Sequence, residues 1–337
     1  MRRSIILSYD YELFFGDKSG TVEKSLIIPT NQILDAMDKY NLKGNFFIDY
    51  FMFKYLEQNT DERSKSDLAL LKHQIQDIVR RGHRIELHLH PHWVDATYNG
   101  DGTWDFSNYT HYMLSTFTEE EIQQFFIEGV NYLHRLVHTV DPNYTICAFR
   151  AGGWAIQPFS KLKSAFQAAH IKIDSSSAFG VYNLKSDQCY DFRIMPQKAM
   201  YFFEDDVCQE NETGSFLEVP ITSFHRNLLY IGIDKVFRKF HFIEKLTDGT
   251  HVRKNDPLNI SNNKKIRRLD ASFKSMFTMS GYSCISVLLS LLFYKKQDLY
   301  CYIDHPKDFT ESTLQGLTIL GKIAKTITYK DLLKSQN

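Results

Sequence analysis

Short apolar runs that are typical of strands alternate with helical patterns in the first two-thirds of the chain. The strand-like runs cover residues 4–9, 45–50, 84–88, 145–150 and 171–174. Helical patterns lie between them at residues 28–40, 65–81, from Thr118 onward, and at 157–170. Strands that alternate with helices form right-handed β-α-β units. The alternation therefore predicts an α/β fold built on a parallel sheet or barrel.

The later part of the chain is less regular but returns to the same pattern near its end. A strand is expected at residues 216–224, and residues 247–268 are polar and rich in Asn, Lys and Asp. We expect an insertion or mobile loop around residues 225–270 rather than a linker between domains. A helix at 285–295, a strand at 299–303, a helix after Phe309 and a terminal strand and helix at 326–334 follow. A single domain over 1–337 is the expected organisation.

Composition excludes several classes of protein. Of 337 residues, 43% are hydrophobic, and 40 Lys+Arg balance 40 Asp+Glu, which argues against disorder and against sequence-blind binding of nucleic acid. The five cysteines are scattered and form no C-x-x-C pair, so a disulfide framework is not expected. Asp10 follows the N-terminus too closely for a secretory signal, and the apolar run at 285–294 is shorter than the roughly 20 residues that span a bilayer. We expect a cytoplasmic chain without a transmembrane segment.

Polar residues capable of chemistry stand where the predicted strands stop. In a parallel α/β barrel, functional groups gather at the carboxyl ends of the strands. The residues at these positions are Asp10 and Glu12, then His88, His90 and His92, then Arg150, then Asp174, and finally Asp304 and His305. Singly, Arg150, Asp174 and His305 suit structural roles; together with the carboxylates and the histidine cluster they predict an active site.

The carboxylates and histidines predict a metal site. Asp10 and Glu12 share one strand face, so one can bind a cation while the other acts as a base. His88 and His92 have H-x-x-x-H spacing, and two histidines with one carboxylate leave open positions on an ion for water and substrate. His88 with His90 is the competing pair, since these two share a strand face.

Arg150 and the residues near it suit supporting roles. The planar guanidinium of Arg150 is suited to holding a carboxylate such as Asp10 in its charged form. Gly152 and Gly153 permit close approach of a ligand to the backbone or make a tight turn. Asp174 is either a helix cap or the partner of a histidine.

The ordered series of motifs resembles the NodB-homology polysaccharide deacetylases, the fourth carbohydrate esterase family. Residues 8–12 (SYDYE) are similar to the first family motif, and His88 and His92 to the second. Residues 87–93 (LHLHPHW) look like the version found in the envelope-polysaccharide-biosynthesis branch. Arg150, Asp174 and the pair His305-Pro306 resemble the remaining motifs. The resemblance implies a distorted (β/α)7 barrel and metal-dependent removal of N-acetyl groups from sugars.

The resemblance also implies a role for each residue. Asp10 is the base, oriented by Arg150, and His305 is the acid, kept protonated by Asp174. The implied ligands of a divalent ion, with zinc expected, are Glu12, His88 and His92. Gly152-Gly153 replaces the usual Pro-Tyr, so Gly153 is the candidate for an N–H that binds the oxyanion. The tryptophans near these motifs, Trp93, Trp104 and Trp154, are candidates for stacking on sugar rings or for the core.

The expected partner is an N-acetylated sugar, a nucleotide-sugar or a lipid-linked glycan, because a chain that is not secreted edits a precursor. Three other readings stay open. An amidase or deformylase of the same fold would act on a small non-sugar amide. A catalytically silent carbohydrate-binding barrel would have no need of Asp10 and His305. An unrelated amidohydrolase barrel would use His88 and His90, but on its first strand rather than its third.

Overall fold

The computed structural model describes residues 3–185, 187–225, 232–233, 235–236, 246–253, 274–280 and 298–334. The helix predicted at 285–295 lies outside these residues, as does most of the insertion predicted around 225–270. Residues 246–253 of that insertion are described, and they pack against the site discussed below.

Seven strands of the described chain run parallel in one continuous sheet. They are, in spatial order, β11 (Phe216–Glu218), β7 (Ile173–Asp174), β6 (Ala148–Ala151), β3 (Arg84–Leu89), β2 (Gly44–Asp49), β1 (Arg3–Tyr11) and β14 (Leu299–Asp304). At the margins, β10 (Tyr201–Phe203) pairs antiparallel with β11, and β15 (Ala324–Thr326) pairs parallel with β1. Every residue of β2 is buried, as expected for a parallel strand covered on both faces. The α/β class and the parallel sheet are confirmed.

Backbone hydrogen bonds connect the two ends of this sheet. Thr222, which follows β11, donates its N–H to Cys301 O of β14 at 3.0 Å. Phe277 N donates to Thr222 O at 2.8 Å, and Ile303 N donates to Phe277 O at 2.9 Å. Residues 222 and 277 adjoin the small hairpin of β12 (Ser223–His225) and β13 (Lys274–Met276). The sheet therefore closes through irregular backbone, as the expected distorted (β/α)7 barrel requires.

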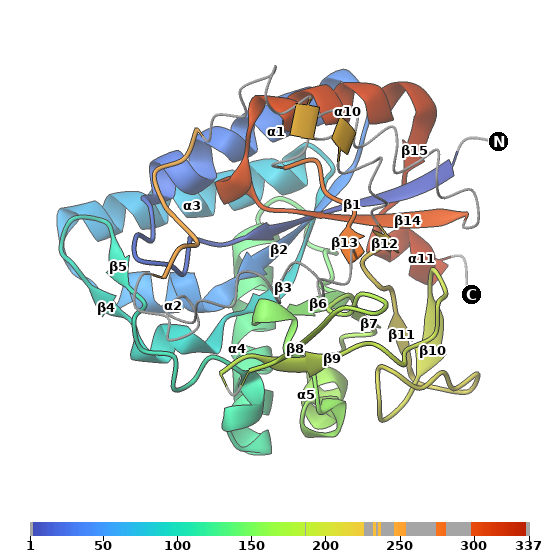
Figure 1. The fold of residues 1–337 in the computed structure, drawn as a ribbon. Coiled ribbons are helices and arrows are strands. Elements are labelled where there is room, and N and C mark those ends of the chain that lie inside the picture. Colours follow the sequence, from blue (N-terminus) through green and yellow to red (C-terminus); the bar gives the residue numbers. More distant parts are fainter. Residues whose placement is uncertain are drawn as a thin grey trace.

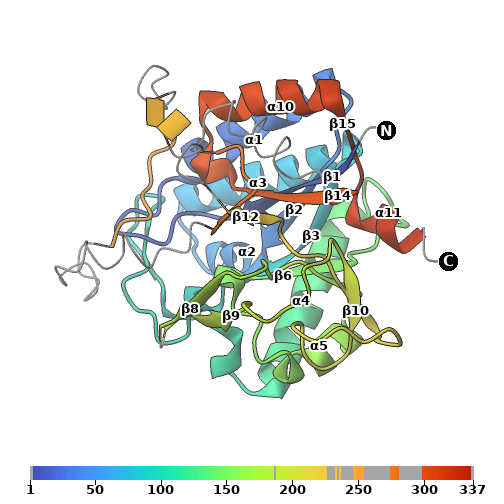
Figure 2. The ribbon, with the colours of Figure 1, turned by 45° about the vertical axis from the view of Figure 1, so that its right-hand side comes forward.

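Helices cover both sides of the sheet (Figures 1 and 2). They are α1 (Ile28–Lys39), α2 (Tyr50–Glu57), α3 (Glu62–Arg80), α4 (Glu119–Val137), α5 (Lys163–Ala168), α10 (Glu311–Ile323) and α11 (Tyr329–Lys334). In both views α1, α3 and α10 lie above the strands, whereas α4 and α5 lie below them. No helix of the described segments is long and apolar enough to cross a membrane.

Most predicted elements are present, and the exceptions have local causes. The capping box predicted at Thr118 and Glu121 starts α4. The strand predicted at 216–224 is interrupted by Pro220, which has no N–H for a sheet ladder, so it forms β11 and β12. Sequence periodicity did not reveal α2, because its aromatic residues continue the apolar run of β2 without a turn. The helix predicted at 157–170 is shorter, with α5 as its regular part.

Candidate active site

The register of the sheet brings the predicted residues to one edge. Asp49 of β2 lies beside His88 of β3, and His88 lies beside Arg150 of β6. On the other flank, Tyr9 of β1 lies beside Asp304 of β14, so the residues that follow each of them, Asp10 and His305, emerge at the same level. Parallel strands of similar length thus carry their terminal polar residues into one buried cluster.

Asp10 and Arg150 form a buried ion pair. Arg150 Nη1 donates to Asp10 Oδ1 at 2.6 Å, and the side chains of both residues are almost completely buried. Arg150 also donates to the Ser175 carbonyl at 2.7 Å and to Ser8 Oγ at 2.9 Å. Burial lowers the pKa of Arg150, but the charge of Asp10 outweighs it and the pKa is raised. The guanidinium therefore pairs with the Asp10 carboxylate and orients it, in the arrangement that a base requires.

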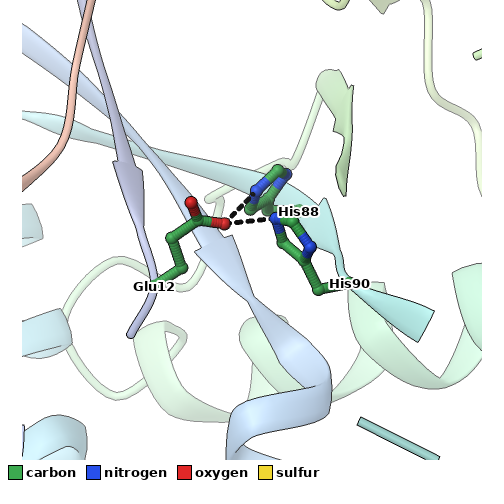
Figure 3. A group of neighbouring side chains, drawn as sticks. All are labelled: Glu12, His88 and His90. Carbon is green, nitrogen blue, oxygen red and sulfur yellow. Dashed lines mark hydrogen bonds and ion pairs between the residues drawn. The ribbon is translucent and has the colours of Figure 1, made fainter. Parts of the chain in front are cut away.

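Glu12 is the centre of a second cluster, shown in Figure 3. Its Oε2 lies 2.9 Å from Nε2 of His88 and in close contact with Nε2 of His90. One potential ligand atom from each of these three residues lies within 4.8 Å of the others. The structure thus gathers Glu12, His88 and His90, which is the competing pair of histidines rather than His88 with His92.

The pairing of His88 with His90 follows from strand geometry. Alternate residues of a strand share a face, and His90 directly follows Leu89, the last residue of β3. His92 comes after the chain has turned at Pro91, and its ring packs 4.2 Å from Phe15 and 4.9 Å from Tyr112, centroid to centroid. Both nitrogens of His92 are buried without a hydrogen-bond partner among the described residues. Its role as a ligand stays a prediction.

The donor set fits a divalent ion such as zinc. His88 Nδ1 donates to the Arg150 carbonyl at 2.7 Å, which fixes the ring and directs Nε2 toward Glu12. Two imidazoles with one carboxylate are a common set for a catalytic zinc ion. Burial lowers the pKa of His90 to about 4, so this imidazole is neutral and suited to metal binding. For His88, burial acts in the same direction, but the hydrogen bond to Glu12 and the charges of Asp10 and Glu12 raise the pKa to about 9.

Lys307, which sequence patterns did not indicate, completes the surroundings of Glu12. Its Nζ donates to Glu12 Oε1 at 2.7 Å and to the Leu13 carbonyl at 2.8 Å, and the residue is only 2% exposed. Burial raises the pKa of Glu12, but His90, Lys307 and the hydrogen bonds from the histidines hold it well below its usual range. Glu12 is therefore charged, with one oxygen turned toward Lys307 and the other toward the histidines.

His305 lies beside the carboxylates of Asp10 and Glu12. Its Nε2 is 3.5 Å from Asp10 Oδ2 and 3.6 Å from Glu12 Oε1, and its Nδ1 is 3.6 Å from Asp308 Oδ2. The sequence predicts Asp174 as the partner of His305, and the structure corrects this prediction. Asp308 is the carboxylate beside His305 Nδ1, because the turn Pro306–Asp308 returns the chain toward the ring.

Asp174 instead belongs to a buried pair of carboxyl groups with Glu218. The two residues are direct neighbours on β7 and β11, and both are fully buried. Asp174 accepts from Ser176 Oγ at 2.7 Å, and Glu218 accepts from Ser177 Oγ at 2.7 Å. Burial raises the pKa of each carboxyl, and the neighbouring carboxyl raises that of Glu218 further. Glu218 is therefore the member that keeps its proton in the folded protein.

The Glu218→Gln variant is expected to be more stable than the wild type above neutral pH. A raised pKa in the folded state means that the folded protein binds a proton that the unfolded chain releases. This contribution is complete below the pKa of the unfolded chain and is lost as the pH rises through the folded pKa. Glutamine does not titrate, so the variant does not lose this stability as the pH rises. Each tenfold difference in proton affinity between the folded and unfolded states corresponds to about 1.4 kcal/mol of unfolding free energy. Urea unfolding from pH 5 to 9 measures the difference.

A control for this variant is Glu210→Gln, because Glu210 is exposed and paired with Lys198. Its pH dependence should match that of the wild type. An equal slope in the Glu218→Gln variant and the wild type between pH 5 and 9 would contradict a protonated Glu218.

The glycine turn after β6 borders the site. Gly153 has a φ of +58°, and a Cβ added there would lie 2.6 Å from the ring of Tyr112. Only glycine meets both conditions without strain. Trp154 follows with a φ of +61° and packs edge-to-face on Tyr190, with one part still exposed. The turn therefore presents backbone and an indole at the rim of the site.

Trp93 is a core residue and does not reach the site. It is completely buried, and its Nε1 donates to Asp49 Oδ2 at 2.7 Å. Asp49 also accepts from the backbone N–H of His90 at 3.2 Å, so it anchors the turn that follows β3. Trp104 is also buried and packs on Trp93. Asp49 was not singled out from the sequence, because the strand predicted at 45–50 ends one residue later than β2 does.

The two carboxylates, His90 and His305 border one pocket of about 220 Å³. Its lining residues come from several separate segments of the chain: Asp10, Glu12, Phe15, His90, Tyr112, Gly153, Trp154, Gln188, His251, Arg253, His305 and Lys307. Asp10, Glu12, His90 and His305 therefore open onto the same space. Arg150 and Asp174 lie behind its wall.

No protein-family model matches this chain, and no curated protein matches it. Solved structures do. A protein from Mycobacterium smegmatis named as a polysaccharide deacetylase is 12% identical, with a TM-score of 0.46, over 99% of this chain and 89% of that one. The peptidoglycan deacetylase PdaC from Bacillus subtilis is 9% identical, with a TM-score of 0.39, over 99% and 92%. Deacetylases are thus among the solved structures that match.

A different enzyme also matches. The 4-alpha-glucanotransferase from Thermococcus litoralis is 11% identical, with a TM-score of 0.52, over 99% of this chain and 40% of that one. The likeness is one of fold. Because proteins of different chemistry share it, the reaction has to be argued from the site itself.

Proposed function

We propose that this chain is a metal-dependent hydrolase that removes N-acetyl groups from a sugar or glycan precursor. The observation that carries the proposal is the pocket onto which Asp10, Glu12, His90 and His305 open. A carboxylate paired with a buried arginine, a Glu-His-His donor set and a partly exposed histidine are the groups that amide hydrolysis needs. A binding barrel without activity would need neither Asp10 nor His305.

Glu12, His88 and His90 are the proposed ligands of the ion, with zinc as the proposed metal. When bound, such an ion polarises an amide carbonyl and lowers the pKa of a coordinated water. His92 is the alternative ligand that the H-x-x-x-H spacing predicts. The variants described below distinguish the two histidines.

The remaining steps use side chains around the pocket. Asp10, oriented by Arg150, takes a proton from the attacking water. His305 lies next to Asp10 and Glu12, with Asp308 beside its Nδ1, and we assign to it the transfer of a proton to the leaving nitrogen. We assign the N–H of Gly153 to the oxyanion and the rim indole of Trp154 to stacking on a sugar ring. We further propose that a single domain acts in the cytoplasm on a free, nucleotide-linked or lipid-linked sugar.

Three variants test this function and the ligand set. Asp10→Asn should lower kcat for acetate release from N-acetylated sugars by about 100-fold or more, since general base catalysis is lost. It should retain zinc, because Asp10 is not a ligand. His90→Ala should lose zinc and activity, whereas His92→Ala, two residues away and equally buried, should retain zinc. Metal content by plasma mass spectrometry and an acetate assay measure these effects.

The same experiment separates the competing readings. A wild-type protein that binds no divalent ion, or an Asp10→Asn variant as active as the wild type, would sink the proposal. Loss of zinc in His92→Ala but not in His90→Ala would restore the predicted H-x-x-x-H ligand pair. Formate released from N-formyl amides in place of acetate would identify a deformylase.

A further inference from the structure

The two carboxylate oxygens of Glu12 have different neighbours. Oε2 lies 2.9 Å from His88 Nε2 and in close contact with His90 Nε2. Oε1 is turned away from both imidazoles, as Figure 3 shows, and accepts from Lys307 Nζ at 2.7 Å. The Nε2 atom of His305 lies 3.6 Å from Oε1, beyond hydrogen-bond distance. Oε2 is therefore the oxygen that stands among the nitrogens of the donor set.

Lys307 is held in place by contacts other than the one to Glu12. Its Nζ also donates to the Leu13 carbonyl at 2.8 Å and lies 4.8 Å from the ring centroid of Phe15. Its own carbonyl accepts from Thr247 Oγ1 at 2.6 Å, and the residue is only 2% exposed. Withdrawal of the ammonium from Glu12 would break these contacts as well, so Lys307 is a fixed part of the site.

The ion pair between Lys307 and Glu12 is buried, which makes it hard to separate. A distance of 2.7 Å is that of a charge-assisted hydrogen bond. Separation would leave an unpaired charge in the interior of the protein, which is strongly unfavourable. The ammonium also repels a divalent ion on the side of Oε1. Oε1 is therefore not available as a metal ligand while Lys307 stays in place.

The number of oxygens that Glu12 gives to an ion matters for catalysis. Carboxylates bind metal ions through one oxygen or through both. A catalytic zinc ion has three protein ligands and keeps a further position for water or substrate. Two imidazoles and Oε2 supply these three ligands. A second oxygen from Glu12 would occupy a position that the reaction needs.

We propose that Lys307 is a positioning residue that restricts Glu12 to one ligand oxygen, Oε2, and so keeps a coordination position open for water and the substrate carbonyl. The inference rests on the metal site of the proposed function and adds the residue that sets how Glu12 binds the ion. It holds with either His90 or His92 as the second imidazole, because Glu12 is a ligand in both sets.

Crystal structures of the zinc-loaded wild type and of Lys307→Met test this role. In the wild type we expect zinc at about 2.0–2.2 Å from Oε2 alone, with Lys307 still bound to Oε1. In Lys307→Met both oxygens of Glu12 should come within ligand distance of the ion. Absorption spectra of the cobalt-substituted proteins give a readout in solution. The d–d bands should weaken in the variant, because an added ligand moves Co²⁺ away from tetrahedral geometry.

Kinetics and metal affinity distinguish positioning from a merely structural role. Lys307→Met should lower kcat by about 10–100-fold, with the effect on kcat rather than on KM, while the Kd for zinc does not rise. Loss of a contact that only supports the ligands would weaken zinc binding instead. Lys307→Arg keeps a cationic donor for Oε1, so it should restore one-oxygen binding and most of kcat.

Lys54→Met is the matched control. Lys54 also donates to a glutamate, Glu128 Oε2 at 2.8 Å, and lies 5.7 Å from the ring centroid of Phe125, but it is not part of the pocket lining. This variant should keep the wild-type coordination and kcat. Two Glu12 oxygens on zinc in the wild type, or one-oxygen binding in Lys307→Met, would overturn the inference. The first of these outcomes needs no variant, so it decides even if Lys307→Met does not fold.

Acetate release tests the proposed function separately. One-oxygen binding that depends on Lys307, without acetate release, would support the positioning role and contradict deacetylation. Acetate release by a wild type with both Glu12 oxygens on zinc would support deacetylation and contradict the positioning role.

Discussion

Replacing Arg150 with methionine is expected to lower the free energy of unfolding by about 3–5 kcal/mol, because Asp10 is left as an unpaired buried charge. Arg150 is fully buried and donates to Asp10, to Ser8 and to the Ser175 carbonyl. Methionine preserves much of the volume but none of these hydrogen bonds. Urea unfolding at neutral pH measures the loss. The variant should also lose activity, since the base is no longer oriented.

A double-variant cycle distinguishes the ion pair from simple packing. Adding Asp10→Asn to Arg150→Met removes the unpaired charge, so the double variant should be more stable than Arg150→Met alone. Arg81→Met is the control, because Arg81 pairs with three aspartates at the surface and should cost less than about 1 kcal/mol. A loss in Arg150→Met no greater than in this control would contradict the role assigned to the pair.

Lys307→Met is expected to make the stability of the protein depend on the metal ion. In the ion-free site, Lys307 is the cation that offsets the buried charge of Glu12 Oε1. Without it, the metal-free protein should lose about 3–5 kcal/mol of unfolding free energy, as when one partner of a buried pair is removed. Added zinc offsets the same charge, so the rise in Tm on zinc addition should be larger in the variant than in the wild type. Differential scanning calorimetry with and without zinc measures both effects.

Lys307→Arg is the conservative control, because it keeps the charge and should behave more like the wild type. A second arm combines Lys307→Met with Glu12→Gln, which removes both charges and should recover stability in the absence of zinc. If zinc raises the Tm of Lys307→Met and wild type equally, Lys307 is not the counter-charge of Glu12 in the ion-free site.

The predicted cluster of Asp10, His88, Arg150 and His305 depends on features that a sequence displays directly. Strand-forming runs can be read from their period, and the residue at the end of each run is known once the run is known. Parallel strands of similar length bring those ends to one edge, whatever path the connecting loops take. Asp49 ends β2 in the same way, but the strand predicted at 45–50 ends at Tyr50, so the end of the predicted run does not indicate it.

The choice between His90 and His92 shows where such reasoning stops. The spacing of the histidines permits either, because a turn after Pro91 can direct His92 toward the site or away from it. The structure places His90 directly after β3, with its Nε2 against Glu12, and packs His92 among aromatic rings. The position of His92 thus depends on Phe15 and Tyr112, aromatic side chains from other segments that a local sequence pattern does not include.

The sequence by itself determined the α/β class, the parallel strands and the polar residues at their ends, because these depend on periods of two and 3.6 residues within short windows. Only the tertiary structure decided the contacts between distant segments. It placed Lys307 on Glu12, Glu218 rather than His305 beside Asp174, and Arg253 at the pocket. The physical reason is that a contact between residues hundreds of positions apart depends on the path of every intervening loop and on the space that the packed core leaves for each side chain.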